Sequence, residues 1–205
     1  MPYYIQRMSQ HRLALSELTW LGPPGNASIA DDHVTVHAGP ESDWFNDPDA
    51  GTCLTTAPVL RFIVSEDCQV SAKVTVDFRT TFDAGVLFVH QGDEDYAKLC
   101  FERSPLGDNT MVSVVTRGVS DDANGPVIKG NVVWARVSAY RNVVAFHWSS
   151  TGHHWHMLRL FALRTPSDTT SIGFSTQSPN GLGCSATFSD IDYMPGAPTN
   201  IRDGS

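Results

Sequence analysis

Apolar and polar side chains alternate strictly along residues 96–102. The apolar positions are Ala97, Leu99 and Phe101. The positions between them are Tyr96, Lys98, Cys100 and Glu102. Since neighbouring side chains of a β-strand point to opposite faces, this pattern predicts a strand with one face in the core and the other face free to carry chemistry.

The same mixture of β-branched residues and partial alternation recurs along the chain, and Gly, Pro, Asn and Asp stand in the gaps. Beside residues 81–90, 96–103 and 111–116, we expect strands at 34–38, 58–64, 70–78, 131–140, 143–149, 154–163, 170–177 and 186–193. The pair Arg141-Asn142 suits a tight hairpin turn. The sequence shows one weak helical pattern, from Gln10 to Leu18, which Pro23-Pro24-Gly25 would end.

A dozen or so short strands with frequent turns predict an all-β fold, either a two-sheet sandwich or a jelly roll. We expect a single domain over residues 1–205, with an N-terminal arm over 1–30 and a flexible tail over 195–205. A hydrophobic content of 41% is sufficient for a substantial core.

Composition also restricts the partners. The net charge is −8 and the basic residues are scattered, so neither nucleic acid nor an anionic membrane is an expected partner. The sequence shows no apolar run of membrane-spanning length and no secretory signal, which favours a cytoplasmic location. We expect a monomer or a homodimer. Cys53, Cys68, Cys100 and Cys184 are widely spaced, so we expect free, half-buried thiols rather than disulfides or zinc ligands.

Short motifs follow one another in order between Trp20 and Phe188. They are Ser42-Asp43-Trp44-Phe45, Phe82-Asp83-Ala84-Gly85, Tyr96-x-Lys98 with Glu102, Ser113-Val114-Val115-Thr116, Ser120-Asp121, Arg136-Val137, Ser150-x-Gly152, Trp155, Arg159 and Ser178-Pro179. Their order resembles the regulation-of-enolase-like family of domains of unknown function, within the concanavalin A-like lectin/glucanase superfamily. The resemblance implies a concanavalin A-like jelly-roll sandwich of two antiparallel sheets with few or no helices, which is the curved architecture of lectins and several glycan-cleaving enzymes. The chain departs from the family pattern at Asp122-Ala123, where an aromatic residue is usual.

In such a sandwich, the hollow side of one sheet lines a groove. We expect polar side chains from separate strands to converge there, namely Lys98, Glu102, Arg136, His147 and Arg159, with Asp121 brought near by the fold. Tyr96, Trp44 and Trp155 are the candidate aromatic walls. Planar hydrogen-bonding groups beside a ring suit a carbohydrate or another polar metabolite. The alternative is a solvated ion network that only stiffens the sheet.

Catalysis is a second reading of the same residues. A conventional glycosidase needs two carboxylates across the scissile bond, and the sequence has no Glu-x-Asp-x-Glu strand to supply them. Proton transfer by Glu102, His147 or Lys98, with Arg136 as an anion clamp, leaves a lyase, isomerase or hydrolase open. A third reading, implied by the family resemblance, is an interaction module for a metabolic enzyme.

A metal site is not expected. His147, His154 and His156 alternate on neighbouring strands, but residues 153–154 follow a glycine in an exposed hairpin, where histidines are usually polar turn residues. The acidic turn 93–95 matches no defined calcium loop. The sequence also lacks a phosphate-binding glycine loop, so no cofactor is predicted.

Overall fold

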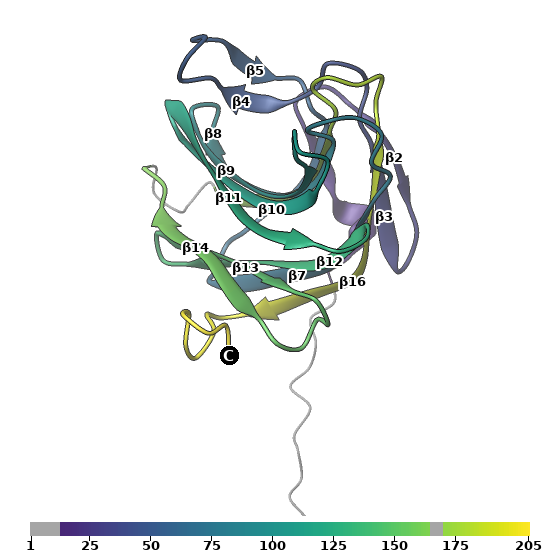
Figure 1. Ribbon diagram of the computed structural model, residues 1–205. Coiled ribbons are helices and arrows are strands. Elements are labelled where there is room, and N and C mark those ends of the chain that lie inside the picture. The colour runs from purple at the N-terminus through teal and green to yellow at the C-terminus, as the bar shows by residue number, and fades with distance from the viewer. Residues whose placement is uncertain (1–12, 165–169) are drawn as a thin grey trace, which may run out of the picture.

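The computed structural model describes residues 13–164 and 170–205. Two seven-stranded antiparallel sheets pack face to face, and a short hairpin lies over the hollow side of one of them (Figure 1). Sheet A has the order β1 (Thr19–Leu21), β6 (Val59–Ile63), β15 (Ser171–Gln177), β8 (Ala84–Gly92), β9 (Asp95–Arg103), β10 (Asn109–Arg117) and β11 (Val119–Ile128). Sheet B has the order β14 (His156–Ala162), β13 (Val143–Ser149), β12 (Val132–Tyr140), β7 (Cys68–Val76), β16 (Ser185–Pro195), β3 (His33–His37) and β2 (Asn26–Ile29). The predicted jelly-roll sandwich is confirmed.

The main core fills the space between the sheets and follows the predicted period of two. Ala97, Leu99 and Phe101 of β9 are all buried in it. Ala135 and Val137 of β12 face them from sheet B. A second apolar cluster lies on the other face of sheet A and contains Trp44, Ala57, Val59, Ala84, Val86, Phe88, Tyr96, Cys100, Val112 and Val114. Sheet A is therefore covered on both faces.

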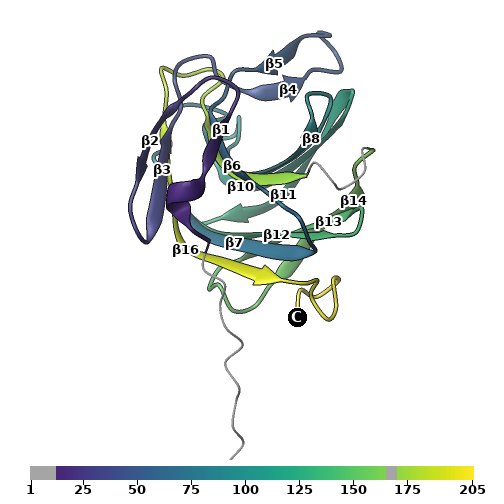
Figure 2. The ribbon, with the colours of Figure 1, turned by 180° about the vertical axis from the view of Figure 1, so that it is seen from behind.

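The cover on the hollow face is the hairpin of β4 (Trp44–Asn46) and β5 (Cys53–Thr55). Its turn is closed by Asp47, whose Oδ1 accepts hydrogen bonds from the backbone N–H groups of Asp49 and Ala50. Asn46 fixes the hairpin to the β10–β11 turn, because its Nδ2 donates to the Gly118 carbonyl over 2.9 Å. The view from behind shows this hairpin standing over β8 (Figure 2).

The strands that pattern alone did not predict are β1, β2, β4, β5 and β11. Strand β11 carries Ser-Asp-Asp-Ala-Asn-Gly-Pro, which is the composition of a turn. It forms the edge of sheet A, pairs with β10 alone, and is mostly exposed. An edge strand tolerates charge and proline because only one of its sides needs ladder hydrogen bonds.

Both ends of the described chain are short and irregular. The expected helix from Gln10 to Leu18 falls partly outside the described residues, and its remainder is a single 3-10 turn, η1 (Leu15–Glu17), with Leu15 and Leu18 in the core. At the other end, residues 196–205 form turns against the outer face of sheet B (Figure 1). Among the described residues, no helix is long and apolar enough to cross a membrane.

The core encloses Gly85, so a substitution at this residue tests the packing of the two sheets. A Cβ at Gly85 would lie 2.7 Å from Val74 Cγ1 and 2.9 Å from Ala186 Cβ. We expect Gly85→Val to lower the free energy of unfolding by ~1–3 kcal/mol because it overpacks the core. Urea denaturation measures this, with Gly92→Val as the control, since a Cβ at Gly92 of the same strand meets nothing within 4 Å. Equal stability of the two variants would contradict the placement of β8.

Candidate functional site

A cleft of about 330 Å³ opens between the β4–β5 hairpin and the hollow face of sheet A. Its polar lining consists of Asp43, Asp47, Thr52, Lys98, Glu102, Asp122, Gln177 and Asn180. Its apolar lining consists of Phe45, Leu54, Phe82, Val112, Val114 and Pro179. The cleft thus combines apolar walls with converging polar groups, as small-molecule sites do.

Lys98 is the centre of this cleft. Only 2% of the residue is exposed, and its Nζ donates to Asp43 Oδ1 over 2.7 Å and to Gln177 Oε1 over 2.9 Å. Burial lowers the pKa of Lys98, but the charge and hydrogen bond of Asp43, together with Cys100 and Glu102, outweigh burial and hold this pKa above its ordinary value. The ammonium therefore stays charged. It has three N–H donors, of which these two bonds use two.

Phe45 and Gln177 extend the arrangement around the lysine. The ring centroid of Phe45 lies 5.7 Å from Lys98 Nζ, within range of a cation–π interaction. Gln177 uses both ends of its amide, since Oε1 accepts from Lys98 while Nε2 donates to Glu102 Oε2 over 3.4 Å and to the Phe82 carbonyl over 3.3 Å. One glutamine thus links β9, β15 and the loop before β8.

Glu102 has an unusual electrostatic environment. Burial raises the pKa of its carboxyl, Lys98 lowers it, and Asp43 and Asp122 raise it further, with a net value of about 8. A carboxyl with this pKa is mostly protonated at neutral pH and is able both to donate and to accept a hydrogen bond. Such a group suits either ligand binding or proton transfer.

Two predicted aromatic walls, Trp44 and Tyr96, lie packed between the hairpin and sheet A rather than in the cleft. Trp44 is 5% exposed, and its Nε1 donates to the Ala57 carbonyl over 2.9 Å. Tyr96 is fully buried and stacks on Phe88 with the ring centroids 5.5 Å apart. The Trp44 and Tyr96 ring centroids lie 5.3 Å apart, and the Tyr96 hydroxyl donates to Asn46 Oδ1 over 3.4 Å, so both residues anchor the hairpin to sheet A. The aromatic side chains that line the cleft are Phe45 and Phe82.

The prediction that Arg136, His147 and Trp155 face the same groove as Lys98 is wrong. Ala135 and Val137 enter the core, so Arg136 must point away from it, on the outer face of sheet B. His147 is its cross-strand partner on β13 and shares this face. The alternation correctly predicts which side chains of each strand point away from the core. It does not show which of the two sheets the strand joins.

Arg159 and Asp121 form a third, separate contact. Arg159 Nη2 donates to Asp121 Oδ2 over 2.9 Å, and Nη1 donates to the Asp121 carbonyl over 3.1 Å. The pair links β14 of sheet B to β11 of sheet A, so it joins the two sheets at an edge. The Asp121 side chain is 66% exposed, and a contact of this kind contributes little stability.

Among the described residues, no group of three or more His, Cys, Asp or Glu side chains is arranged to hold a metal ion. His156 stacks on Trp148 with the ring centroids 4.8 Å apart. His147 Nε2 lies 3.0 Å from the Ile201 carbonyl. The four cysteines are free, with Cys53 exposed and the other three buried.

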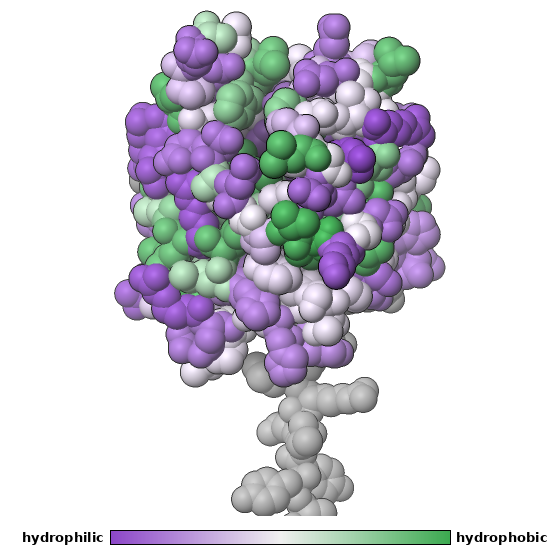
Figure 3. Space-filling view, in the orientation of Figure 1, coloured by the Kyte–Doolittle hydropathy of each residue, from purple (hydrophilic) through white to green (hydrophobic). Residues whose placement is uncertain are grey.

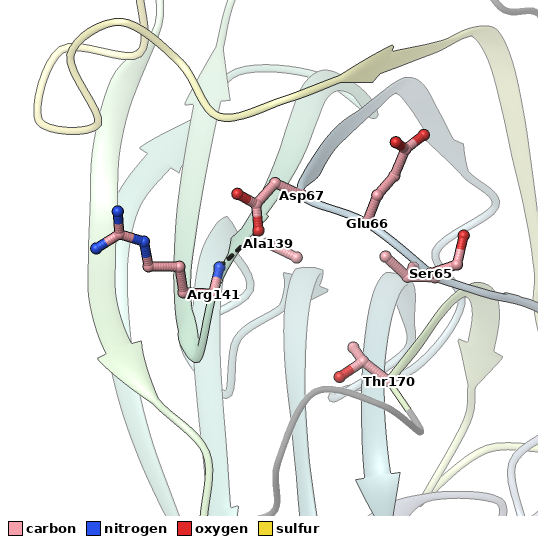
Figure 4. A pocket seen from close by; sticks show the side chains of 7 residues that line it. Ser65, Glu66, Asp67, Ala139, Arg141 and Thr170 are labelled. Atoms are coloured by element: carbon pink, nitrogen blue, oxygen red, sulfur yellow. Dashed lines mark hydrogen bonds between the residues drawn. The ribbon is translucent and has the colours of Figure 1, made fainter.

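Another hollow, of about 370 Å³, lies at one end of the sandwich between the β6–β7 loop and the β12–β13 turn (Figure 4). Its Asp67 accepts a hydrogen bond from the Arg141 backbone N–H over 2.7 Å, while the Arg141 guanidinium points away (Figure 4). The molecular surface seen in Figure 3 intersperses hydrophobic with hydrophilic residues. The polar convergence around Lys98 makes the cleft under the hairpin the better candidate.

Residue reasoning missed Asp43, Phe45, Phe82, Asp122 and Gln177 as cleft residues. Asp43, Phe45 and Phe82 stand within motifs that carry the family resemblance, and Gln177 directly precedes another such motif, Ser178-Pro179. The motifs therefore contain cleft residues, but the sequence does not show that these motifs lie next to one another in the fold. Long-range contacts bring them together, for example the bridge between Ser42 and Ser178.

The comparisons with known proteins agree with this architecture. The family model described as "Protein of unknown function (DUF1349)" matches residues 20–196. No curated protein matches the chain. A functionally unknown protein from Saccharomyces cerevisiae has a TM-score of 0.81 at 25% identity, covering 91% of this chain and 99% of that one.

Two further solved structures share the fold alone. A GH43 protein from Bacillus licheniformis has a TM-score of 0.61 at 14% identity, and the match covers 80% of this chain and 33% of that one. An alginate lyase from Klebsiella pneumoniae has a TM-score of 0.53 at 11% identity, covering 84% of this chain and 85% of that one.

The Lys98–Asp43 pair yields a stability prediction. We expect Lys98→Met to lower the free energy of unfolding by ~3 kcal/mol, because removing one partner leaves a buried carboxylate without its counter-charge. Adding Asp43→Asn to Lys98→Met should restore part of the loss. Urea denaturation measures both, with the exposed Lys129→Met as the control. If Lys98→Met matched Lys129→Met, the pair would not hold the hairpin.

Glu102 yields a pH prediction. Its pKa of about 8 in the fold lies above its ordinary 4.5, so the folded protein binds the proton more tightly than the unfolded chain. The contribution to stability is thus complete below about pH 4.5 and is lost as the pH rises through about 8. We expect Glu102→Gln, which imitates the protonated form, to flatten this decline. Chemical denaturation at several pH values measures the effect, and parallel profiles would contradict it.

Proposed function

Because the chain belongs to the DUF1349 family of proteins of unknown function, we propose its function from the cleft itself: a binding module for a neutral, polyhydroxylated ligand of the carbohydrate class. The observation that carries the proposal is the convergence of Lys98, Glu102 and Gln177 beneath a rim that contains Phe45. Hydroxyl groups both donate and accept hydrogen bonds, and these three side chains offer both roles.

Charge supports a neutral ligand over an anionic one. Lys98 is already paired with Asp43, and Asp47 and Asp122 also line the cleft. With Arg136 on the other sheet, the cleft has no guanidinium to bind a phosphate or a carboxylate. An anion entering here would meet more negative than positive charge, and its desolvation would not be compensated.

The aromatic and apolar rim supports a ring-shaped ligand. Phe45 is half-buried, and Phe82 and Leu54 complete the apolar wall. The less polar face of a sugar ring can pack against such a wall while its hydroxyls reach the polar floor. The fold likeness to a GH43 protein and an alginate lyase adds that carbohydrate-active proteins use this sandwich, although it does not transfer their activities to this chain.

A panel of sugars that share a pyranose ring but differ in charge tests the proposal. We expect thermal shift and calorimetry to detect glucose or xylose and to give at least tenfold weaker binding of glucuronate and glucose 6-phosphate. Phe45→Ala should weaken sugar binding at least tenfold, whereas Ile63→Ala, an exposed apolar residue away from the cleft, should leave it unchanged. No response to any neutral sugar would overturn the proposal.

An enzyme acting on the same ligand class is the second candidate, and the raised pKa of Glu102 is the observation that favours it. A general acid or base works best when its pKa is near the working pH. His147 and Arg136 no longer belong to this candidate because they lie on the outer face of sheet B. Conversion of a glycan by the wild-type protein, lost in Glu102→Gln and Lys98→Ala, would establish catalysis; equal turnover in these variants would dismiss this assignment.

A role in regulating a metabolic enzyme, as the family resemblance implies, is a third proposal. Regulation of a metabolic enzyme, a cytoplasmic location and a monomeric or homodimeric state are predictions from the sequence. Capture of a metabolic enzyme from a native lysate would support the interaction module, and the same capture by Phe45→Ala would show that the cleft plays no part in it.

A further inference from the structure

Three of the candidate residues that lie outside the cleft, Arg136, His147 and Trp155, lie together on the outer face of sheet B. The Arg136 guanidinium stacks on the Trp155 ring at 3.9 Å. His147 of β13 is the cross-strand neighbour of Arg136. Ser138 follows two residues along β12 and is the cross-strand neighbour of Gln69 of β7. We call Arg136, Ser138, His147 and Trp155 the arginine cradle.

The arginine cradle is buried but incompletely bonded. Arg136 is 6% exposed, and Ser138 and His147 are fully buried. Among the described residues, nothing accepts from or donates to Arg136 Nε, Ser138 Oγ or His147 Nδ1. Buried polar groups in native proteins almost always have partners, so these three neighbouring atoms call for a hydrogen-bonding partner that the described residues do not supply.

The cover of the arginine cradle is the chain's own C-terminal segment, residues 196–205. Arg136 Nη1 donates to the Gly204 carbonyl over 2.5 Å, and His147 Nε2 lies 3.0 Å from the Ile201 carbonyl. Both contacts use backbone carbonyls, which are neutral acceptors. No carboxylate of the described residues is paired with Arg136, and burial accordingly lowers its pKa to about 10.

Gly204 fits this cover closely. It is buried with φ +75°, and a Cβ there would lie 3.1 Å from Trp155 Cβ and 3.2 Å from His147 Cδ2. A side chain at residue 204 would therefore push the segment off the arginine cradle. The contact depends on a residue without a side chain, so a single substitution can release it.

We propose that the arginine cradle is a second binding site, for a ligand that carries a single carboxylate, and that residues 196–205 occupy it as an intramolecular competitor. A guanidinium binds carboxylates through two parallel N–H bonds, and Arg136 Nε is an unused donor for such a pair. The neighbourhood favours one negative charge over two, because Asp192 and Asp203 already interact electrostatically with Arg136 and His147.

Competition makes the proposal testable. A ligand that must displace the segment can bind only those molecules in which the arginine cradle is uncovered. Its apparent Kd is therefore the intrinsic Kd divided by the fraction of uncovered molecules. We expect Gly204→Val to tighten acetate binding at least fivefold, measured by NMR titration of the full chain at constant ionic strength. Gly107→Val is the matched control, since Gly107 also has a positive φ, +86°, but a Cβ there meets nothing within 4 Å.

Acetate, acetamide and inorganic phosphate separate the chemistries. Acetamide has the shape of acetate without its charge, so we expect it not to bind, and phosphate should bind more weakly than acetate. Arg136→Gln should abolish acetate binding. If that variant failed to fold, Trp155→Leu would take its place, because it removes the surface on which the guanidinium is held.

Several results would overturn the proposal. They are acetate binding that survives Arg136→Gln, equal binding of acetate and acetamide, equal acetate affinity in Gly204→Val and Gly107→Val, and no acetate binding in any variant. Binding only of a separate peptide with the sequence of residues 196–205 would also overturn it, since the cradle would then be a peptide site. None of these results affects the cleft under the hairpin, which lies on sheet A.

Discussion

One buried ion pair determines where the candidate site can form. Lys98 extends from β9 into the hollow of sheet A, and Asp43 reaches it from the segment just before β4. A lysine at this depth requires a nearby counter-charge, because its desolvation is otherwise too costly. The pair therefore draws the β4–β5 hairpin over sheet A, and the hairpin in turn creates the cleft. The placement of the hairpin and the existence of the cleft therefore depend on the same two residues.

The sequence predicted the strands and their phases well where both faces carry a clear signal. In β9, the apolar set entered the core and the polar set faced the hollow side, as the alternation requires. The sequence did not predict β11, because this acidic segment contains glycine and proline and resembles a turn. It forms a strand because it pairs with the edge of β10. Local propensity cannot show such pairing, since the decisive partner lies elsewhere in the chain.

The candidate site was predictable in part. Lys98 and Glu102 were found from their spacing on one strand, and the structure places both in the cleft. Arg136 was assigned to the wrong face of the molecule, because two sheets of a sandwich have two outward faces and the alternation within one strand is the same for either. Asp43 and Gln177 went unnoticed because their importance arises from contacts across more than fifty residues. The polar residues that the sequence suggested thus form two clusters, one on the hollow face of sheet A and one on the outer face of sheet B.

The position of Cys53 has a practical consequence. It lies exposed on β5, whereas burial raises the pKa of the thiols of Cys68, Cys100 and Cys184 and keeps them in their unreactive, protonated form. A thiol-directed fluorophore will therefore attach selectively to the hairpin of the natural sequence. The protein thus carries its own labelling site on the hairpin that covers the cleft, and a fluorophore there reports on the surroundings of the cleft without the engineering of a single residue.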